Sequence, residues 1–424
     1  MKKSLIFMAA MLAAVLAFAE PQLTLATKDA MPVYKCGEKA AFTFSVTDDG
    51  KPVKEGRYSL AVTLGGGKVL KRISVDLAKT NPVEFSETLA EPGFLLVRVL
   101  DDKNKPVMVP VPKRPGVKTQ VLAGAAFDPE KIKMGYDCPK DFMKFWENNR
   151  KLLEKTPVEL TRDERSNKDY NVWYVTIKSL NDHTLTGYLS IPTGKGPFPA
   201  YVEVPPAGPG AVGPVTTYAK QAITLIINVH QYPTARVYKE QAENHKKLAG
   251  NYPKKGAGSR DTYFYRAVYT GVDRAINYIA DSQDWDHKHM VISGSSQGGG
   301  SALILSGLNK NITAMSANVP ALCDHGGFKF DRQPGWPFLR GTPNVDEFAP
   351  YFDAGNFARF IKVPALVSCG FIDTTCHPAS VYAAFNQIKS PKKMVCMPTT
   401  GHAITPAYSR ERAAFNRKHL GLEK

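Results

Sequence analysis

The sequence has few cysteines and no metal-binding pattern. Its 424 residues contain six cysteines, which are Cys36, Cys138, Cys323, Cys369, Cys376 and Cys396. They are too scattered for a disulfide scaffold, and none has the C-x-x-C spacing of a zinc site. No cluster of His, Cys and Glu has the ligand spacing of a catalytic metal. We therefore expect mainly buried free thiols, no metal and no cofactor.

The chain has a long apolar run at its amino terminus and no second one after it. Two lysines, an unbroken apolar stretch and Ala17-Phe18-Ala19 precede Glu20, which is the pattern of a signal peptide with a small-x-small cleavage site. Residues 1–19 are thus predicted as a signal peptide that is cleaved near Ala19. No other segment is long and apolar enough to span a bilayer. We expect no membrane insertion, and a secreted or periplasmic protein.

The chain has fewer acidic than basic residues, and the excess positive charge is not concentrated in one segment. The formal net charge is +16, from 55 Lys and Arg against 39 Asp and Glu. Such a balance can attract nucleic acid, anionic lipid or acidic polysaccharide. Here the basic residues are spread along the whole chain, and no basic run is interleaved with aromatic residues as in a nucleic-acid groove. The sequence favours a generally basic surface without nucleic acid as a partner, while attraction to an acidic glycan stays open.

In residues 20–112 apolar and polar residues alternate with a period of two. Phe42, Phe44 and Val46 alternate with polar residues in AFTFSV, and similar short runs recur with turns rich in Gly, Asp and Asn between them. This spacing predicts an all-β, immunoglobulin-like sandwich. The sandwich carries no acid, base or metal cluster, so a structural role is the simplest interpretation and carbohydrate binding the alternative. Residues 113–127, at the Pro-rich and basic stretch VPKRPGVKT, are predicted as a linker.

From residue 128 to residue 424 the sequence pattern changes and predicts alternating strands and helices. FPAYVEV, AITLIINV and HMVISG are typical of buried strands, and YFYRAVYTGVDRAINYIADS is typical of a helix between two of them. This alternation predicts an α/β fold with a mostly parallel sheet and helices on both faces. In such folds the chemistry gathers at the carboxyl ends of the strands.

The strongest local motif lies at the end of one predicted strand. GSSQG at 294–298 matches G-x-S-x-G between a strand and a helix, which is the context of a nucleophile elbow in an α/β-hydrolase. In that fold the acid and the histidine follow the serine along the chain. Asp373 follows a later apolar strand, and His402 follows the strand after that. Ser296 is thus the predicted nucleophile, His402 its base, and Asp373 the acid that orients the imidazole.

Other residues near these strand ends are weaker candidates. His377 lies four residues after Asp373 and is the rival base in the same loop. Together with His230 and Gln231, which follow another strand, it is also a candidate for lining the pocket. The backbone N–H of Gln297, directly after the nucleophile, is one predicted donor to the oxyanion.

The stretch PPAGPGAVG at 205–213 contains the G-x-G-x-x-G spacing of a dinucleotide loop. Pro214 and the β-branched Val215 follow it, which is a weak helix opening, and no acid lies at a second strand end about 20 residues on, where a ribose would need one. We interpret the stretch as the early strand-end loop that supplies the second oxyanion donor in an α/β-hydrolase. Pro205 and Pro206 have no N–H to donate.

In combination, DFMKFWENN, GSSQGG, the GFID strand end and the late GH pair resemble the acetylxylan esterase / cephalosporin-C deacetylase group of α/β-hydrolases, carbohydrate esterase family 7. The resemblance covers residues 128–424 and not the sandwich. It implies a serine esterase that removes acetyl groups from xylan or xylo-oligosaccharides without a cofactor, with Ser296, Asp373 and His402 as catalytic residues. By alignment with the family's oxyanion loop, Ala207 takes the place of a Tyr, and its N–H is the second candidate donor.

The chain departs from this family around the acyl pocket. Ala403 stands where the family usually has Glu, HQYP replaces an R-G-Q type segment, and PPA replaces an H-G-Y type loop. These changes leave the triad intact and keep other substrates open, namely another carbohydrate ester, another acyl ester or a peptide. A non-catalytic glycan-binding protein is a third hypothesis. Family members often form oligomers, so a homo-oligomer stays open as well.

Overall fold

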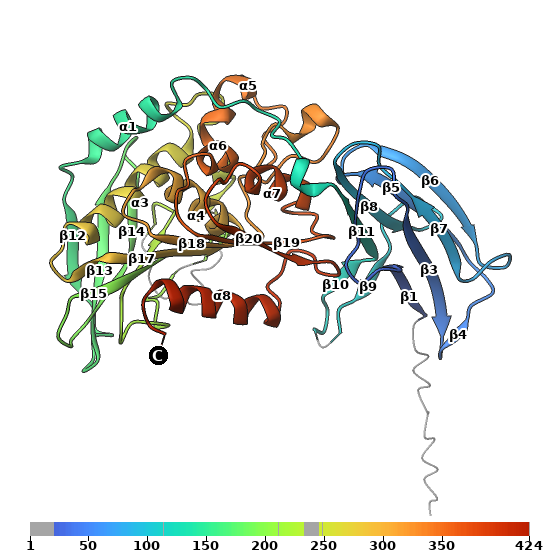
Figure 1. Ribbon diagram of the computed structural model, residues 1–424, viewed down its shortest axis with the longest axis horizontal. Helices are drawn as coiled ribbons and strands as arrows, with labels where there is room; N and C mark the ends of the chain where they lie inside the picture. Colours follow the sequence, from blue (N-terminus) through green and yellow to red (C-terminus); the bar gives the residue numbers. More distant parts are fainter. Residues whose placement is uncertain (1–20, 113, 211, 233–245, 248, 424) are drawn as a thin grey trace, which may run out of the picture.

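A computed structural model describes residues 21–423 except 113, 211, 233–245 and 248. The predicted signal peptide lies outside these residues. The chain forms a β-sandwich and an α/β unit, which lie side by side (Figure 1).

The sandwich consists of two sheets and a hairpin. Its strands are β1 (Gln22–Thr27), β2 (Val33–Tyr34), β3 (Ala40–Asp48), β4 (Lys51–Pro52), β5 (Arg57–Leu64), β6 (Val69–Asp76), β7 (Val83–Glu87), β8 (Gly93–Leu100), β9 (Met108–Pro110), β10 (Lys118–Gln120) and β11 (Leu122–Phe127). In one sheet β3 pairs with β1, β4 and β7, and the other sheet has the order β2–β11–β8–β5–β6. β9 and β10 form a separate antiparallel hairpin. Phe42, Phe44 and Val46 are buried in the core between the sheets, as their alternation predicts.

The linker predicted at 113–127 is wrong over most of its length. Residues 118–120 form β10, and residues 122–127 form β11, which pairs with both β8 and β2. The sequence LAGAAF hides this strand because small residues occupy both of its faces. Ala123 and Ala125 belong to the sandwich core, whereas Gly124 and Ala126 face the α/β unit.

The α/β unit is built on one large sheet. Its strands are β12 (Val158–Arg162), β13 (Tyr170–Lys178), β14 (Thr184–Pro192), β15 (Phe198–Val204), β16 (Ile223–Asn228), β17 (Trp285–Ser295), β18 (Ala314–Asn318), β19 (Ala365–Gly370) and β20 (Lys392–Met397). Its helices are α1 (Phe142–Leu153), α3 (Phe264–Ala280), α4 (Gln297–Leu308), α5 (Val345–Phe348), α6 (Ala354–Ala358), α7 (Pro378–Phe385) and α8 (Pro406–His419).

The strand order of this sheet is β12–β13–β14–β16–β15–β17–β18–β19–β20. The pairs from β12 to β16 are antiparallel, and those from β16 to β20 are parallel. Helices α3, α4 and α7 cover one face and α8 the other (Figure 1). β16 and β18 are buried along their whole length, as expected for parallel strands with both faces covered. The predicted α/β-hydrolase fold is confirmed.

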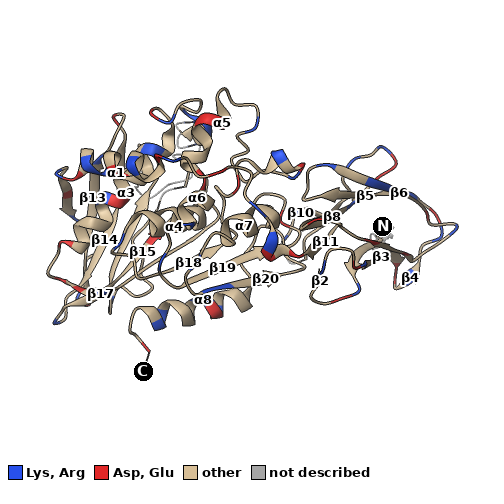
Figure 2. Cartoon of the chain, turned by 45° about the horizontal axis from the view of Figure 1, so that its top comes forward, with Lys and Arg blue, Asp and Glu red and all other residues tan. Residues whose placement is uncertain are grey.

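Basic residues occur along the described chain. Lys and Arg lie on strands of the sandwich and on strands and helices of the α/β unit (Figure 2). In the part of the chain that the structure describes, no helix is both long enough and apolar enough to cross a membrane. All six cysteines are free thiols, and three of them, Cys323, Cys369 and Cys376, are buried.

Strand β8 joins the hydrophobic cores of the two units. Leu95 and Val97 belong to the sandwich core, whereas Phe94 belongs to the core of the α/β unit. The Phe94 ring lies edge-on to Phe371, with 5.1 Å between the ring centroids. The run GFLLVRVL is almost continuously apolar because both of its faces are buried.

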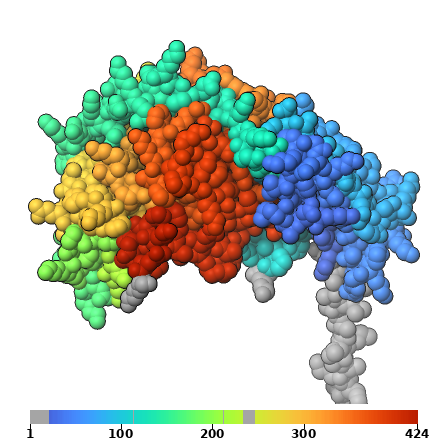
Figure 3. All heavy atoms as spheres, in the orientation of Figure 1, coloured from blue at the N-terminus to red at the C-terminus, as the bar shows by residue number. Residues whose placement is uncertain are grey.

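The two units also touch through their backbones. A Cβ atom on Gly124 of β11 would lie 2.4 Å from the carbonyl oxygen of Phe371, so the approach requires glycine. Elsewhere in the junction the Lys68 N–H donates to the Asp331 carbonyl at 2.9 Å. Figure 3 shows the sandwich atoms, in blue, packed directly against the red atoms of the C-terminal segments. The sandwich therefore packs directly against the α/β unit and is not joined to it by the covalent connection alone.

Replacing Gly124 with alanine should weaken this docking. The added methyl must push β11 away from Phe371, and we expect Gly124→Ala to lower the free energy of unfolding by about 1–3 kcal/mol. Urea denaturation measures the change. Gly194→Ala is the matched control, since its Cβ would meet only Phe198 at an ordinary 3.9 Å. Equal stability of the two variants would contradict the prediction.

Candidate active site

Ser296 occupies a strained turn between β17 and α4. Its φ of 56° and ψ of −119° lie outside the regions that non-glycine residues usually adopt. The turn is held by neighbouring backbone: the Ser296 N–H donates to the Asn318 carbonyl, and the Ser296 carbonyl accepts from Gly300 and Ala321, all at 2.9 Å. Ser296 is only 8% exposed, so it is largely shielded from solvent.

The two glycines of GSSQG allow the strands to approach this turn. A Cβ atom on Gly294 would lie 2.3 Å from the backbone of Gly298. A Cβ atom on Gly298 would lie 2.0 Å from the carbonyl oxygen of Val204, the last residue of β15. Glycine is therefore required at both positions for steric reasons. Without side chains there, the end of β15 and the following loop lie directly against the turn at Ser296.

The structure brings together the three residues predicted as a triad. The His402 Nε2 lies 2.9 Å from the Ser296 Oγ, and its Nδ1 lies 2.7 Å from the Asp373 Oδ2. A carboxylate only accepts, so Nδ1 carries the hydrogen and Nε2 is left to accept the serine proton. The second oxygen of the buried Asp373 accepts from the backbone N–H groups of Thr375 and Cys376 at 2.8 and 2.9 Å. These two bonds fix the carboxylate that orients the imidazole.

The two candidate oxyanion donors belong to the start of α4 and to the loop after β15. Gln297 is the first residue of α4, where the helix end favours negative charge. Ala207 follows β15 and lines a cleft of about 240 Å³ together with Pro206 and Gly208. Among the hydrogen bonds of the described residues, none uses the N–H of Ala207 or of Gln297. Both N–H groups therefore remain candidate donors to a bound oxygen.

Tyr252 links these two places, and sequence analysis did not identify it. Its hydroxyl donates to the Gln297 Oε1 at 2.8 Å and accepts from the Gly208 N–H at 3.4 Å. Tyr265 donates to the same Gln297 oxygen at 2.8 Å. The His230 Nε2 donates to the Gly208 carbonyl at 2.6 Å. A tyrosine in the loop sequence NYPKK belongs to no motif, so only the folded chain reveals this role.

The other predicted pocket residues have different positions. His230 is buried beneath the loop after β15 and supports it through Gly208. Gln231 is exposed, donates to the Asp182 carbonyl at 3.2 Å and accepts from Lys255 at 3.3 Å, so it does not join the triad residues.

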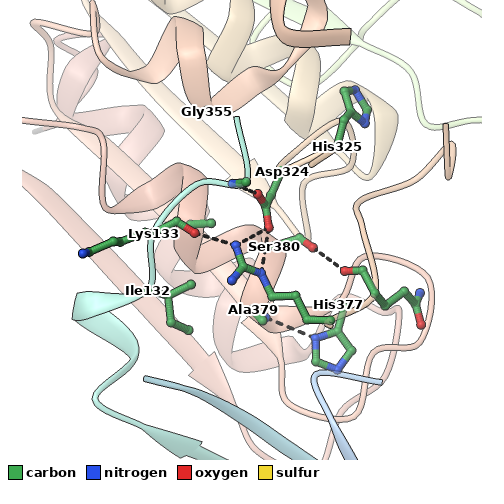
Figure 4. A network of polar contacts seen from close by, with 12 residues as sticks. Ile132, Lys133, Asp324, His325, Gly355, His377, Ala379 and Ser380 are labelled. Carbon is green, nitrogen blue, oxygen red and sulfur yellow. Dashed lines mark hydrogen bonds and ion pairs between the residues drawn. The ribbon is translucent and has the colours of Figure 1, made fainter. Parts of the chain in front are cut away.

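The pocket-lining role predicted for His377 is wrong. The residue is fully buried, and its Nδ1 caps α7 by accepting from the Ala379 N–H at 3.3 Å (Figure 4). Its ring packs on Phe94 and would contact a Cβ atom on Gly66 at 2.9 Å. Pro378 starts the helix immediately after it, so the ring is turned toward the sandwich and not toward Ser296.

A buried ion pair lies beside His377. The Asp324 carboxylate accepts from the Arg332 Nε at 2.9 Å and from the Gly135 N–H at 2.7 Å (Figure 4). Burial lowers the pKa of His377 to about 3, and the positive charges of Arg332 and Arg98 act in the same direction. His377 is therefore a neutral structural residue of the junction. No group of three His, Cys, Asp or Glu that could hold a metal occurs among the described residues.

Comparison with known proteins identifies one family. The model of the acetyl xylan esterase family matches residues 130–328 and 343–420. The acetyl esterase Axe7A of Xylanibacter ruminicola is 30% identical over 398 residues, which cover 88% of this chain and 85% of that protein. The resemblance predicted from the sequence is confirmed. Residues 128–424 are only 297 of the 424 residues, so the match to Axe7A extends into the sandwich, contrary to expectation.

Two solved structures share the fold of the α/β unit. Acetyl xylan esterase 1 from Thermoanaerobacterium sp. JW/SL YS485 has a TM-score of 0.59 at 18% identity, covering 70% of this chain and 98% of its own. The acetyl xylan esterase from Paenibacillus sp. R4 has a TM-score of 0.56 at 22% identity, covering 69% of this chain and 98% of its own. At these identities the likeness concerns the fold alone.

Removing the Tyr252 hydroxyl should slow turnover. Tyr252→Phe leaves the Gly208 N–H without its acceptor and loosens the loop that carries Ala207, so we expect kcat for p-nitrophenyl acetate to fall roughly 3- to 10-fold. Tyr265→Phe is the matched control, because it removes a bond to the same Gln297 oxygen without touching Gly208. Equal effects of the two variants would refute a role for the Tyr252–Gly208 bond.

Buried His377 should make stability depend on pH. Its pKa is lowered on folding, so the unfolded chain takes up the proton first as the pH falls below about 6.5, and stability is lost toward acid. At pH 5 this costs about 2 kcal/mol relative to pH 7.5. His377→Asn keeps a cap for α7 and should remove about that much of the acid-induced loss in urea denaturation. His183 and His325, with pKa values lowered to about 4, remain in both proteins. Parallel pH profiles would contradict the assignment.

Proposed function

Because this chain belongs to the acetyl xylan esterase family, we propose that it removes acetyl groups from xylan or xylo-oligosaccharides through Ser296, His402 and Asp373. The protein is an esterase. The observation that carries the mechanism is the continuous hydrogen-bonded chain from the Ser296 hydroxyl through both nitrogens of His402 to Asp373. The substrate follows from the relatives, which are named for acetyl or acetyl xylan ester hydrolysis.

The reaction begins with attack of the Ser296 Oγ on the acetyl carbonyl carbon, while His402 Nε2 takes the hydroxyl proton. The carbonyl oxygen becomes an oxyanion, which the N–H groups of Gln297 and Ala207 stabilise. When the tetrahedral intermediate collapses, the bond to the sugar oxygen breaks and that oxygen takes the proton from His402. Acetyl-Ser296 and a free sugar hydroxyl remain.

Water completes the cycle by the same route in reverse. His402 removes a proton from the water as it attacks the acetyl carbon, and the second oxyanion occupies the same donors. Collapse breaks the bond to the Ser296 Oγ, which regains its proton from His402, and acetate leaves. Asp373 keeps its charge throughout, orients the ring and stabilises the imidazolium that forms twice in each turnover.

We also propose that the protein acts outside the cytoplasm, in the periplasm or as a secreted enzyme. The support is the amino-terminal sequence, in which Lys2, Lys3, an apolar run and the small residues Ala17 and Ala19 precede Glu20. A polymeric substrate such as xylan is consistent with that location, because it cannot enter a cell.

Ser296→Ala tests the function. The variant lacks the nucleophile and should lower kcat by at least about 1,000-fold, for p-nitrophenyl acetate and for acetate release from acetylated xylo-oligosaccharides alike. Ser295→Ala, the neighbouring serine of the same motif, should keep the wild-type rate within about threefold. A Ser296→Ala enzyme with more than a tenth of wild-type activity would exclude the mechanism. A wild-type preference for butyryl, feruloyl or aminoacyl esters over acetyl esters would exclude the substrate.

A further inference from the structure

A cleft of about 350 Å³ opens beside His402, at the junction of the two units. The α/β unit contributes the loops after β19 and β20 to its lining, including His402 itself. The sandwich contributes Met108, Lys118, Thr119, Gln120 and Leu122. The volume falls in the range of about 300–1,000 Å³ that is usual for ligand sites. Figure 1 shows the β9–β10 hairpin next to the carboxyl ends of β19 and β20.

Three of the four hairpin residues that line this cleft lie on one side of the hairpin, and Thr119 is the exception. Met108 of β9 stands directly opposite Gln120 of β10, and Lys118 lies two residues before Gln120 on the same strand. Residues that are directly opposite, or two apart on one strand, point to the same side. Val109 points the other way and packs on the sandwich core. Met108 is 46% exposed, so the cleft face combines an apolar side chain with an ammonium and an amide.

This face is held in place by the sandwich. The Val107 N–H donates to the Val99 carbonyl at 3.0 Å, and the Val99 N–H donates to the Val121 carbonyl at 3.1 Å. Both ends of the hairpin are thereby tied to β8, the strand that carries Phe94 into the junction. A surface fixed in this way loses little conformational entropy when a ligand binds.

The chemistry of the ester reaction indicates which part of the substrate lies nearest to this cleft, because His402 is one of its lining residues. The His402 Nε2 must reach the leaving oxygen to protonate it, whereas the carbonyl oxygen is directed toward Gln297 and Ala207. The leaving alcohol therefore lies on the His402 side of Ser296. For an acetylated glycan that alcohol is the sugar, and the wall on this side belongs to the sandwich.

The cleft continues along the junction. A neighbouring cleft of about 270 Å³ shares Leu122, Ile372 and Thr399 with the first one and extends to Thr27 and Asp29 of the sandwich. Together they form a track lined by both polar and apolar side chains. A track of this kind suits several consecutive sugar units better than a small ester.

We propose that the Met108–Lys118–Gln120 face of the sandwich binds the sugar chain that carries the acetyl group. The sandwich then selects the glycan, and the α/β unit performs the hydrolysis. This proposal rests on the proposed function, because it uses His402 to place the leaving alcohol. Methionine packs against the apolar face of a sugar ring, and the lysine and glutamine side chains supply hydrogen bonds to its hydroxyl groups.

The test compares two substrates in the full-length protein. In the double variant Met108→Ala/Lys118→Ala, the ratio of kcat/KM for acetylated xylo-oligosaccharides to kcat/KM for p-nitrophenyl acetate should fall about tenfold, mainly through KM for the oligosaccharide. Lys54→Ala and Leu70→Ala are matched controls, since both residues are exposed on the sandwich outside the two clefts. They should keep the wild-type ratio. An unchanged ratio in the double variant would overturn the proposal.

A binding measurement separates this proposal from the proposed function. Titration calorimetry with acetylated xylo-oligosaccharides uses the Ser296→Ala protein, with and without the double change, and the affinity should fall about tenfold. If the wild type cleaves p-nitrophenyl acetate but no acetylated xylo-oligosaccharide, the substrate given under the proposed function is wrong. Calorimetry alone then tests whether the Met108–Lys118–Gln120 face binds the glycan. Absence of binding, or equal binding with and without Met108 and Lys118, would overturn this proposal.

Discussion

The position of Asp373 depends on a contact between two units of different architecture. Its loop begins at Phe371, whose carbonyl meets the backbone of Gly124, and ends at His377, whose ring packs against Gly66. Gly124 and Gly66, which contact the two ends of this loop, both belong to the sandwich. An imidazole keeps one tautomer and one orientation only if its carboxylate partner is fixed. The sandwich is therefore a part of the catalytic scaffold and not an attachment to it.

A second constraint concerns the elbow. Ser296 has a backbone conformation that costs free energy, and it persists because its N–H bonds to Asn318 and its carbonyl accepts from Gly300 and Ala321. The same close packing leaves no space for a side chain at Gly298, against the end of β15. Ser296, the loop after β15 and β18 thus form one packed unit. Electrostatic stabilisation of a transition state requires groups that are held in place in this way.

The match to Axe7A bears on how the two units are related. The family model begins at residue 130, yet the similarity to Axe7A reaches beyond it into the sandwich. In this chain β8 and β11 contact the loop of Asp373, and the β9–β10 hairpin borders His402.

The sequence by itself determined the α/β-hydrolase fold, the alternation of the sandwich, and the order Ser296, Asp373, His402. These are local properties: a period of two, a G-x-S-x-G turn between strand and helix, and polar residues directly after apolar strands. Only the tertiary structure decided that residues 122–127 are a strand, that His377 faces the sandwich, and that Tyr252 supports the loop after β15. Each depends on contacts between residues far apart in the chain, such as Gly124 with Phe371. No local pattern encodes such a contact, because it arises from the shapes of two surfaces that exist only after each unit has folded.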